Sequence, residues 1–554
     1  MPKELNIQEA ERYKSSLLRD RQSWLDEWKD IRDFMLPYHG RFDGENPNEG
    51  KRRDDKIVQN AAKMALRVLS AGLLTGLTSP SRPWFRLGLP NPELRDNVQV
   101  RAWLDEVERR MYMVFSESNA YPALHAIYQE LGGFGTACAL VSEDVEDVIR
   151  LRVYTIGEYA LGLDSRLNVN AVCREIWMTA GQMVEQFGED KCSDQVRAKV
   201  RNQQTEDWYM VNHIIMPNPD KQSNRLDYKG KEFISAYWEK GAKGDGFLQV
   251  KGYEEFPILA PRWETISGDS YGRGPSWDTI GDVRMLQDMR LDTLEALDKH
   301  IDPPVMMPAS LRNENVDLTP GGVTLVPSND MQYGIRPIYA FNPNFEGLEY
   351  SIQQVVERIN KAFYVDMFLM LQQVADQQKT AFEVAEMTRE KMLMLGPAIE
   401  QQEETLLKPL IERTFGIMFR NGLLPEPPQE IQGQPLQIEY VSILAQAQKA
   451  VATAAIREWI GMIAEIAQAF PDALMKVNAP EVVDQYGELL GIPVKLIRSD
   501  EEVEQAKAQQ AQQAQMAQMM AMAQQGAGAA KDLSQTDMGN NTNAIQAMFG
   551  EAGV

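Results

Sequence analysis

The pattern of apolar and polar positions predicts a largely helical chain interrupted by one block of strands. Apolar residues recur at three- and four-residue steps from Ile7 to Leu36, from Ala65 to Leu77 and from Trp103 to Phe115, and this spacing places side chains on one face of a helix. After Gly132 and Gly133 the pattern changes to short alternating runs, which are typical of half-buried antiparallel strands. These runs are Ile149–Tyr154, Trp208–Met216, Phe233–Trp238 and Phe256–Leu259.

Two further helices are long enough to form rods. The first begins at Gly274 and Pro275 and ends before Pro303, so its two dozen or so residues would span roughly 35 Å. The second begins near Glu349 and keeps an apolar side as far as Met370. The residues between the rods contain a Pro-Gly-Gly turn and a β-like run. We predict that the rods and this insert form a projecting stalk.

The remainder of the chain is predicted to be helical, with a different composition at its end. Helices are expected at Thr380–Leu395, from there to Arg420 after a break at Gly396 and Pro397, at Leu444–Ala469 and at Glu481–Leu490. From Ala508 to Ala530 the chain has no charge and consists mainly of Gln, Ala and Met. Beyond Gly526 we expect disorder, whereas the Ala stripe between Glu501 and Ala523 leaves both self-association and disorder open.

The helix that ends at Leu77 has an unusually small apolar face. Gly72 and Gly76 lie four residues apart, which would let another backbone approach closely, although each glycine weakens an isolated helix by about 1 kcal/mol. Two prolines then end the helix and hold Trp84 and Phe85 in an extended segment. Only residues 68–81 lack charge, too few for the roughly 20 apolar residues of a membrane span. We predict a structural role for Gly72, Gly76, Trp84 and Phe85. We predict no membrane partner.

Composition limits the classes of partner. The chain has 554 residues, 44% of them hydrophobic, and carries 57 Lys and Arg against 80 Asp and Glu, a formal charge of -23. The length predicts three or four domains, and the charge argues against tight static wrapping of DNA, because phosphates need neutralising cations. Cys138, Cys173 and Cys192 show no paired spacing, so a reducing cytoplasm is the expected place of synthesis.

Signals for catalysis are few, and we predict no catalytic, metal or cofactor site. The histidines His39, His125, His213 and His300 are scattered without metal-ligand spacing, and acidic clusters such as residues 143–147 match no EF-hand. Residues 268–272 match the GxSxG pattern, but a nucleophile elbow needs a strand before Ser270 and a helix directly after it. The helix here is delayed until Pro275, and a hydrolase is therefore the minor alternative.

Several segments, taken in order, resemble the portal or head-to-tail connector proteins of short-tailed bacteriophages. The resemblance covers most of the chain from about residue 10 to residue 505, and the order of the segments is more specific than any one of them. The segments are WKDIRDFMLPYHGRF from Trp28, AAKMALRVLSAGLLTGLTSPSRPWFRL from Ala61, YGRGPSWDTIGDVRMLQ from Tyr271, TAFEVAEMTREKMLMLGP from Thr380, LLKPLIERTFGIMFRNGLLPEPP from Leu406 and GIPVKLIRSDEEV from Gly491.

The resemblance implies an α+β, predominantly helical portal fold and a ring, usually dodecameric, at one capsid vertex. DNA would enter through the ring during packaging and leave through it during ejection. By resemblance the chain divides into an N-terminal wing, a first stem helix, a clip insert, a second stem helix, a tunnel loop, wing return helices, a crown and a Gln-, Ala- and Met-rich tail. The corresponding ranges are 1–270, 271–301, 302–348, 349–371, 372–380, 381–440, 441–505 and 506–554.

The implied partners are further copies of the chain, the major capsid or scaffolding protein, terminase, a tail adaptor and double-stranded DNA bound without sequence specificity. An acidic channel would keep DNA contacts short-lived, because carboxylates repel phosphates. We expect transient phosphate contacts at Lys299 and Lys379. The expected tunnel-loop residues are Gln372, Gln373, Asp376, Gln377, Gln378 and Lys379.

Two functional classes remain besides the conduit. One is a virion interaction protein, such as an internal core or ejection component, that self-associates through the tail without forming a channel. The other is the hydrolase at Ser270. Oligomeric state separates the conduit from both, since a head-to-tail contact that closes on itself gives a ring.

Overall fold

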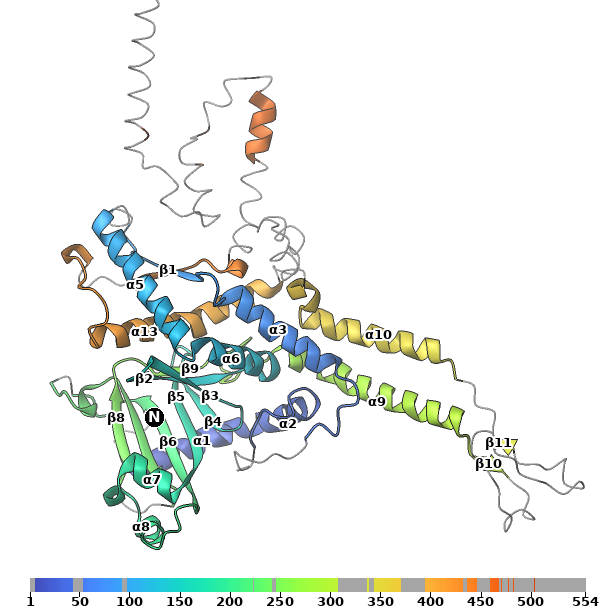
Figure 1. Cartoon of the computed structure of the whole chain (residues 1–554), viewed down its shortest axis with the longest axis horizontal. Coiled ribbons are helices and arrows are strands. Elements are labelled where there is room, and N and C mark those ends of the chain that lie inside the picture. Colours follow the sequence, from blue (N-terminus) through green and yellow to red (C-terminus); the bar gives the residue numbers. More distant parts are fainter. Residues whose placement is uncertain are drawn as a thin grey trace, which may run out of the picture. The chain divides into compact units, whose positions relative to one another are not determined.

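The computed structural model divides the chain into two compact units, Met1–Gln448 and Lys449–Val554, which are described separately (Figure 1). In the first unit the structure describes residues 5–42, 53–91, 97–222, 224–241, 246–306, 336–337, 343–369, 394–431 and 436–445; in the second it describes residues 459–467 and the single residues 470, 477, 482 and 503. The first unit is an α+β fold with small antiparallel sheets. The described part of the second unit contains a helix at residues 459–467.

The N-terminal helix is broken into two parts, where the sequence pattern predicts one helix from Ile7 to Leu36. Helix α1 spans Ile7–Arg21 and helix α2 spans Leu25–Phe34, with a 3-10 turn at Gln22–Trp24 between them. The turn contains no glycine or proline, but its Trp24 contacts the rings of Trp28 and Trp277. Tertiary packing of this indole therefore accompanies a break that helix periodicity does not reveal.

A five-stranded antiparallel sheet forms the largest β element. Its strands lie in sequence order, and α1 covers one face of the sheet through an apolar core. Lys14 of α1 is buried in this layer, where its ammonium group donates to Asn212 and Glu175 at 2.9 and 3.2 Å. The strands are β4 Tyr159–Leu163, β5 Val169–Thr179, β6 Trp208–Pro217, β7 Phe233–Glu239 and β8 Gln249–Tyr253.

A second sheet has three strands in the order β3-β2-β9. They are β2 Cys138–Asp144, β3 Val148–Tyr154 and β9 Ile258–Leu259, so the strand that alternation predicts from Phe256 is shorter than expected. Between β5 and β6 the chain forms α7 Ala180–Phe187 and α8 Asp194–Arg201, which share a second, smaller core with residues of the sheet. A capping box at Thr179 and Gln182 begins α7, which satisfies backbone N–H groups at that helix start.

Helices α3, α5 and α6 form the third layer of the first unit. They span Ala61–Leu77, Val98–Glu117 and Ala120–Phe134. Helix α6 ends at Gly135, whose φ of 77° is the left-handed conformation that favours glycine at a helix end. A Cβ atom at Gly132 would lie 2.8 Å from Leu66 Cδ1, so α3 and α6 approach each other closely because α6 has no side chain there.

Trp84 and Phe85 are both buried at a junction between distant parts of the chain. Strand β1 Phe85–Gly88 pairs with β12 Gln437–Tyr440. The Tyr112 hydroxyl of α5 accepts from the N–H groups of Trp84 and Phe85 and donates to the Phe85 carbonyl, at 2.7 to 2.9 Å. Glu108 accepts from the Leu87 N–H at 2.6 Å. Side chains of α5 thus satisfy the strand edge that β12 does not reach.

The C-terminal helices of the first unit differ from expectation at Gly396 and Pro397. Both lie within a helical run at residues 394–402, so the predicted break is wrong at this point. The run continues through a π-helical turn at Glu403–Leu407 into α13 Lys408–Arg420, and Gly422 follows with a φ of 67°.

Three features of the described residues bear on the classes considered above. The three cysteines are buried and unpaired. The described helices include none with the length and hydropathy needed to cross a membrane. The described residues include 444–445 and 459–467 of the helix expected at Leu444–Ala469, whereas the helix at Glu481–Leu490 and the Ala stripe lie almost entirely outside them.

Glu108 should make the stability of the first unit depend on pH. Burial raises the pKa of Glu108 from 4.5 to about 7, so the folded protein holds this proton up to a higher pH than the unfolded chain does. The free energy of unfolding should therefore fall as pH rises from about 4.5 to about 7 and stay lower above it. We expect Glu108→Gln, which keeps an acceptor for Leu87, to be more stable than the wild type by about 1 to 3 kcal/mol at pH 8 and equally stable at pH 4.

The measurement is urea denaturation followed by tryptophan fluorescence across this pH range. Glu117→Gln removes a charge from an exposed position of the same helix and should leave the pH profile unchanged. If the free energy of unfolding changed with pH in the same way in the wild type and in Glu108→Gln, the raised pKa of Glu108 would be contradicted.

Candidate functional site

Helices α9 and α10 run antiparallel and form what we call the two-helix arm (Figure 1). Helix α9 spans Pro275–Ile301, with proline at its first position, and α10 spans Phe345–Ala362. Two ion pairs join the helices: Arg358 to Asp282 at 2.8 Å and Arg290 to Glu349 at 3.2 Å. Their order along the two helices fixes one antiparallel register, although exposed pairs of this kind add little stability, about 1 kcal/mol or less each.

The root of the arm is joined to the end of α6 by polar bonds. The Ser276 hydroxyl donates to the Gly132 carbonyl at 2.9 Å, and the Trp277 indole N–H donates to the Phe134 carbonyl at 3.1 Å. The Gly272 N–H donates to the Thr136 hydroxyl at 2.8 Å. The bonds from Ser276 and Trp277 satisfy carbonyls of the last turn of α6 that would otherwise have no helical partner. The start of α9 therefore caps the end of α6.

The GxSxG motif lies at this root and serves packing. A Cβ atom at Gly272 would lie 2.5 Å from the Gly135 carbonyl oxygen, so glycine is required for the close backbone contact. Tyr271 is 1% exposed and its ring packs edge-on against Trp28. Ser270 lies in an irregular stretch between the bridged residues Glu264 and Arg273, with no strand directly before it. This geometry lacks the strand-turn-helix context of a nucleophile elbow.

The apolar side of α9 changes from buried to exposed along its length. Ile280, Val283 and Leu286, near the root, are at most 7% exposed. Leu294 and Ile301, toward the far end, are 41% and 71% exposed. We call the exposed apolar residues of this part the distal stripe. They are Leu291, Leu294, Leu297 and Ile301 of α9, with Tyr350 of α10. Among the described residues of one chain nothing buries this stripe, and an apolar surface of this kind favours contact with another molecule.

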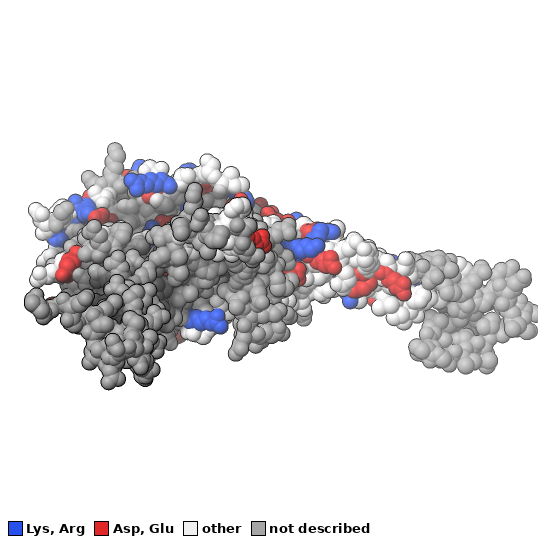
Figure 2. Space-filling view, turned by 90° about the horizontal axis from the view of Figure 1, so that it is seen from above, with Lys and Arg blue, Asp and Glu red and all other residues white. Residues whose placement is uncertain are grey.

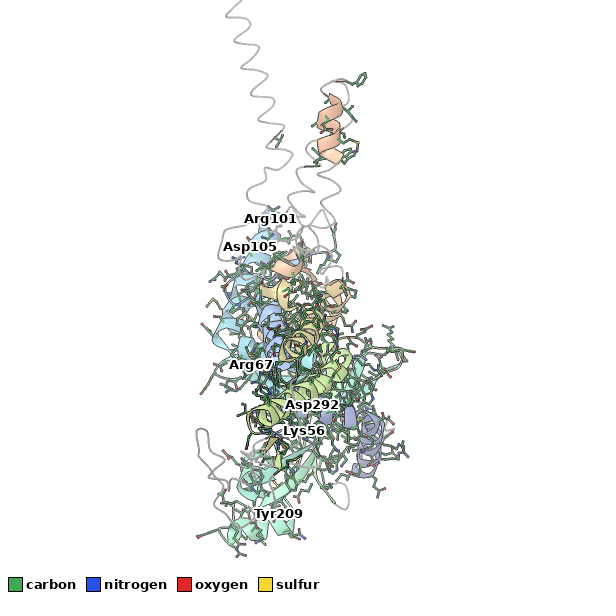
Figure 3. The ribbon with its side chains drawn as sticks, turned by 90° about the vertical axis from the view of Figure 1, so that its right-hand side faces the viewer. Lys56, Arg67, Arg101, Asp105, Tyr209 and Asp292 are labelled. Carbon is green, nitrogen blue, oxygen red and sulfur yellow. The ribbon has the colours of Figure 1, made fainter. Side chains whose placement is uncertain are left out.

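The arm carries more carboxylates than basic groups, and charges of both signs are interspersed along it (Figure 2). Asp292, labelled on α9 in Figure 3, is one of these acids. Lys299, an expected phosphate contact, lies on the same helix and pairs with Glu295 at 2.6 Å. Both groups are largely exposed, so the pair can open at low cost in free energy.

The arm leads into α10 and then into a bend that the sequence pattern misses. The expected helix continues to Met370, but α10 ends at Ala362, and Tyr364 has a φ of 55°, a conformation rare for aromatic residues. A short helical stretch follows at residues 365–369. All of the expected tunnel-loop residues, including Lys379, lie outside the described residues, as does most of the insert between the two helices.

The small face of α3 packs against two bulky side chains, one from the stretch after α10 and one from the residues after β12. A Cβ atom at Gly72 would lie 2.1 Å from Phe368 Cδ1, and one at Gly76 would lie 2.7 Å from Leu444 Cδ1. Phe368 and Leu444 are at most 1% exposed. The expectation of a closely approaching backbone is therefore wrong in detail, since the space above each glycine holds a bulky side chain. Gly72 connects α3 to the residues that follow α10.

Sequence reasoning missed one buried polar residue that holds the arm. Gln287 of α9 is 2% exposed. Its side-chain oxygen accepts from the N–H groups of Val58 and Gln59 at 2.8 Å each, and its amide donates to the Gln59 carbonyl at 3.0 Å. The available signal was a polar residue directly after Leu286, on the side of α9 that is otherwise apolar.

The described residues contain no group of His, Cys, Asp and Glu arranged to hold a metal ion. The acidic turn after β2 is held by its own backbone, since Asp144 accepts from the N–H groups of Glu146 and Asp147. His39 pairs with the buried Glu130 at 2.7 Å. Burial would lower the pKa of His39, but the hydrogen bond and charge of Glu130 outweigh it and raise the value. His300 packs its ring against Phe345.

The sequence of the chain matches known proteins over most of its length. Residues 8–497 match the family described as bacteriophage head to tail connecting protein. The chain is similar to the probable portal protein of Bordetella phage BPP-1, with 42% identity over 521 residues that cover 94% of each chain. It is also similar to the portal protein of Salmonella phage epsilon15, with 41% identity over 540 residues, 97% of each chain. Neither name denotes an enzyme.

Among solved structures, a chain from the virion of a native gene transfer agent particle aligns with 77% of this chain and 93% of its own. The identity is 11% and the TM-score is 0.31. A likeness at this level carries no argument.

Replacing Gly72 should destabilise the contact between α3 and Phe368. We expect Gly72→Ala to lower the free energy of unfolding by about 1 to 3 kcal/mol, because the added methyl group overpacks a filled site. The matched control is Gly281→Ala on α9, where nothing lies within 4 Å of the new Cβ atom and helix propensity predicts a gain of about 0.5 to 1 kcal/mol. Urea denaturation of both variants measures the difference, and equal effects would show that the Phe368 contact is unimportant.

Replacing Gln287 should weaken the attachment of the arm. Gln287→Met keeps the length of the side chain but removes the partner of two backbone N–H groups and one carbonyl at a partly buried position. We expect a loss of about 1 to 2 kcal/mol, because water can reach part of this site and replace some of the lost hydrogen bonds. Gln353→Met, at an exposed position of α10, should change the free energy of unfolding by about 0.5 kcal/mol or less. Chemical denaturation compares the two, and a similar small loss in both would contradict a holding role for Gln287.

Proposed function

We propose, on the premise that this chain belongs to the bacteriophage head to tail connecting protein family, that its copies close into a ring around a channel for DNA. Portal function and a place in the virion at the capsid vertex follow from the match across residues 8–497 and from two portal proteins that align over nearly their full length. The channel, its lining and its docking sites are our proposal. The family implies a homo-oligomeric ring, and we infer a dodecamer.

The two-helix arm is the part that we assign to the channel wall. Its distal stripe is exposed in one chain, and neighbouring copies in a ring would bury it. Carboxylates outnumber Lys and Arg along both helices, and such a surface repels phosphates and keeps DNA mobile without sequence preference. Lys299 would make only brief phosphate contacts, because Glu295 competes for its charge.

The remaining parts are assigned by the same premise. We infer that residues 1–270 form the wing, 271–301 and 349–371 the stem, 302–348 the clip, 372–380 the tunnel loop, 381–440 the wing return and 441–505 the crown, followed by the tail. Support for the stem comes from α9 and α10 themselves, which occupy most of the two stem ranges. Support for a β-containing clip is limited to the antiparallel pair of β10 Val305–Met306 and β11 Arg336–Pro337.

We place terminase and then the tail adaptor at the clip, since its described strands β10 and β11 lie at the end of the arm away from α6 (Figure 1). The capsid or scaffolding protein would contact the wing. These assignments give each partner a different surface, so that assembly contacts on the wing need not change when one partner replaces another at the clip.

Negative-stain imaging of the purified full chain is the direct test. We expect annular particles with an axial hole for the wild type. Leu294→Asp combined with Leu297→Asp should convert the rings to smaller species, because charges would be buried between copies. Leu226→Asp, at a residue 98% exposed and away from the arm, should keep the rings.

Other outcomes would contradict the proposal in distinct ways. Wild-type monomers or fibres would favour the non-channel virion component. Intact rings in the double variant would remove the distal stripe from the contact between copies. A continuous Lys and Arg lining, found by mapping the lumen of an assembled ring, would contradict the acidic channel.

A further inference from the structure

Arg174 of β5 is a partly buried cation with no counter-ion among the described residues. Its guanidinium carbon lies 3.9 Å from the centroid of the Tyr154 ring on β3. The Nε–H group is buried and has no acceptor, and no described residue forms an ion pair or hydrogen bond with the side chain. Stacking on an aromatic face stabilises a guanidinium by a kcal/mol or so, but it satisfies none of the N–H donors, which lie in the plane of the group.

The residues that pair with Arg174 across the sheet, Tyr159 and His213, carry no negative charge to balance it. Arg174 pairs across the sheet with His213, which pairs with Tyr237 of β7, so the three side chains lie on one face. The His213 ring stacks on Tyr237 at 3.9 Å, and its Nε2 atom bonds to the Ser235 hydroxyl at 2.8 Å. Burial, and secondly the charge of Arg174, hold the pKa of His213 well below its usual value. Histidine is therefore neutral here.

Strand β3 of the three-stranded sheet, which carries Tyr154, adds two more groups that lack partners among the described residues. Tyr154 is 6% exposed, and its hydroxyl is buried with no hydrogen-bond partner among the described residues. Arg152 lies two residues earlier on the same face of β3 and is exposed, again with no ion pair or hydrogen bond to a described residue. Arg150, the next residue on that face, differs because it pairs with Asp147 at 3.3 Å.

The two guanidinium groups act on the same tyrosines. Burial raises the pKa of Tyr237, and the charges of Arg174 and Arg152 oppose that rise. The same two charges oppose the rise at Tyr154. Carboxylates in the neighbourhood are already engaged, since Glu158 pairs with Arg41 and Glu143 with Arg420. Asp144 accepts from the N–H groups of Asp147 and Glu146, which lower its pKa together with the charges of Arg150 and Arg152. Lys251 of β8, which pairs with Ser235 of β7, adds a further positive charge on this face of the sheet.

Donors without acceptors among the described residues therefore share this face, in a chain whose acids outnumber its bases by 80 to 57. Unpaired buried donors are uncommon and costly, and a ligand that only accepts hydrogen bonds would satisfy them. We propose that Arg174, Arg152 and the Tyr154 hydroxyl form a binding site for a single oxyanion, either a phosphate or a carboxylate group. The site lies between β3 and β5, in the part of the chain that we assign to the wing, and does not depend on the ring or the channel.

Isothermal titration calorimetry of the full chain with inorganic phosphate tests the site, with chloride added to hold the ionic strength constant. We expect saturable binding that weakens about tenfold in Arg152→Gln and in Arg174→Gln, the loss of about one charge-assisted hydrogen bond each. The matched control is Arg109→Gln, which removes an exposed arginine that pairs with Glu106 on α5 and should leave the affinity unchanged.

A second titration distinguishes the two sources of the anion. Glutarate carries the carboxylate of a glutamate side chain, so tighter binding of glutarate than of phosphate would indicate an acidic side chain as the occupant, and the reverse order a phosphate. Arg152 is exposed, and its variant should fold normally; if Arg174→Gln unfolds, Arg174→Lys replaces it. Absence of saturable binding of both anions, or equal affinity in the Arg152 variant and the wild type, would overturn the proposal.

Discussion

The contact between Gly135 and Gly272 is the constraint on which the rest of the arm depends. Two backbones that are far apart in sequence approach so closely there that neither residue can carry a side chain. A Cβ atom at Gly135 would lie 2.4 Å from the Gly272 carbonyl oxygen, and Gly135 has a φ of 77°. Because proteins transmit little strain through loose contacts and much through close-packed ones, this contact fixes the direction in which α9 leaves α6.

Buried polar groups make that direction specific. Ser276 and Trp277 bind the last carbonyls of α6, and Gln287 binds the backbone just before α3. Apolar packing alone tolerates small rotations of a helix about its axis, but a hydrogen bond that is lost in a buried site leaves an unpaired group at a cost of about 1 to 3 kcal/mol. The arm is therefore positioned by a few directional bonds, while its two exposed ion pairs contribute mainly to register.

Much of this fold was predictable from periodicity. The strands β3, β6 and β7 and the start of α9 at Pro275 follow directly from apolar spacing and helix-start residues. The break at Trp24 and the bend at Tyr364 did not, because both occur without glycine or proline. The same limit applies to Pro397, where the local signal indicated a break and the structure continues.

The candidate site was predictable in outline and not in its contacts. The exposed apolar residues of α9 and its carboxylates are visible in the sequence, whereas Gln287 and Arg174 matter through partners, or through the lack of them, on other elements. Arg174 and Arg150 cannot be distinguished by residue type. Only the three-dimensional structure shows that Arg150 has an aspartate beside it and Arg174 has a tyrosine ring from another sheet. Alternation places a side chain on a face, but it does not say which residues share that face.

The packing of Phe368 against Gly72 has a consequence for sequence divergence. One edge of the Phe368 ring occupies the volume that a Cβ atom at residue 72 would need. A larger residue at 72 is therefore compatible with this packing only if residue 368 becomes smaller, and a smaller residue at 368 opens a void unless residue 72 grows. The two positions, almost three hundred residues apart, should behave as one inherited unit, changing together or not at all.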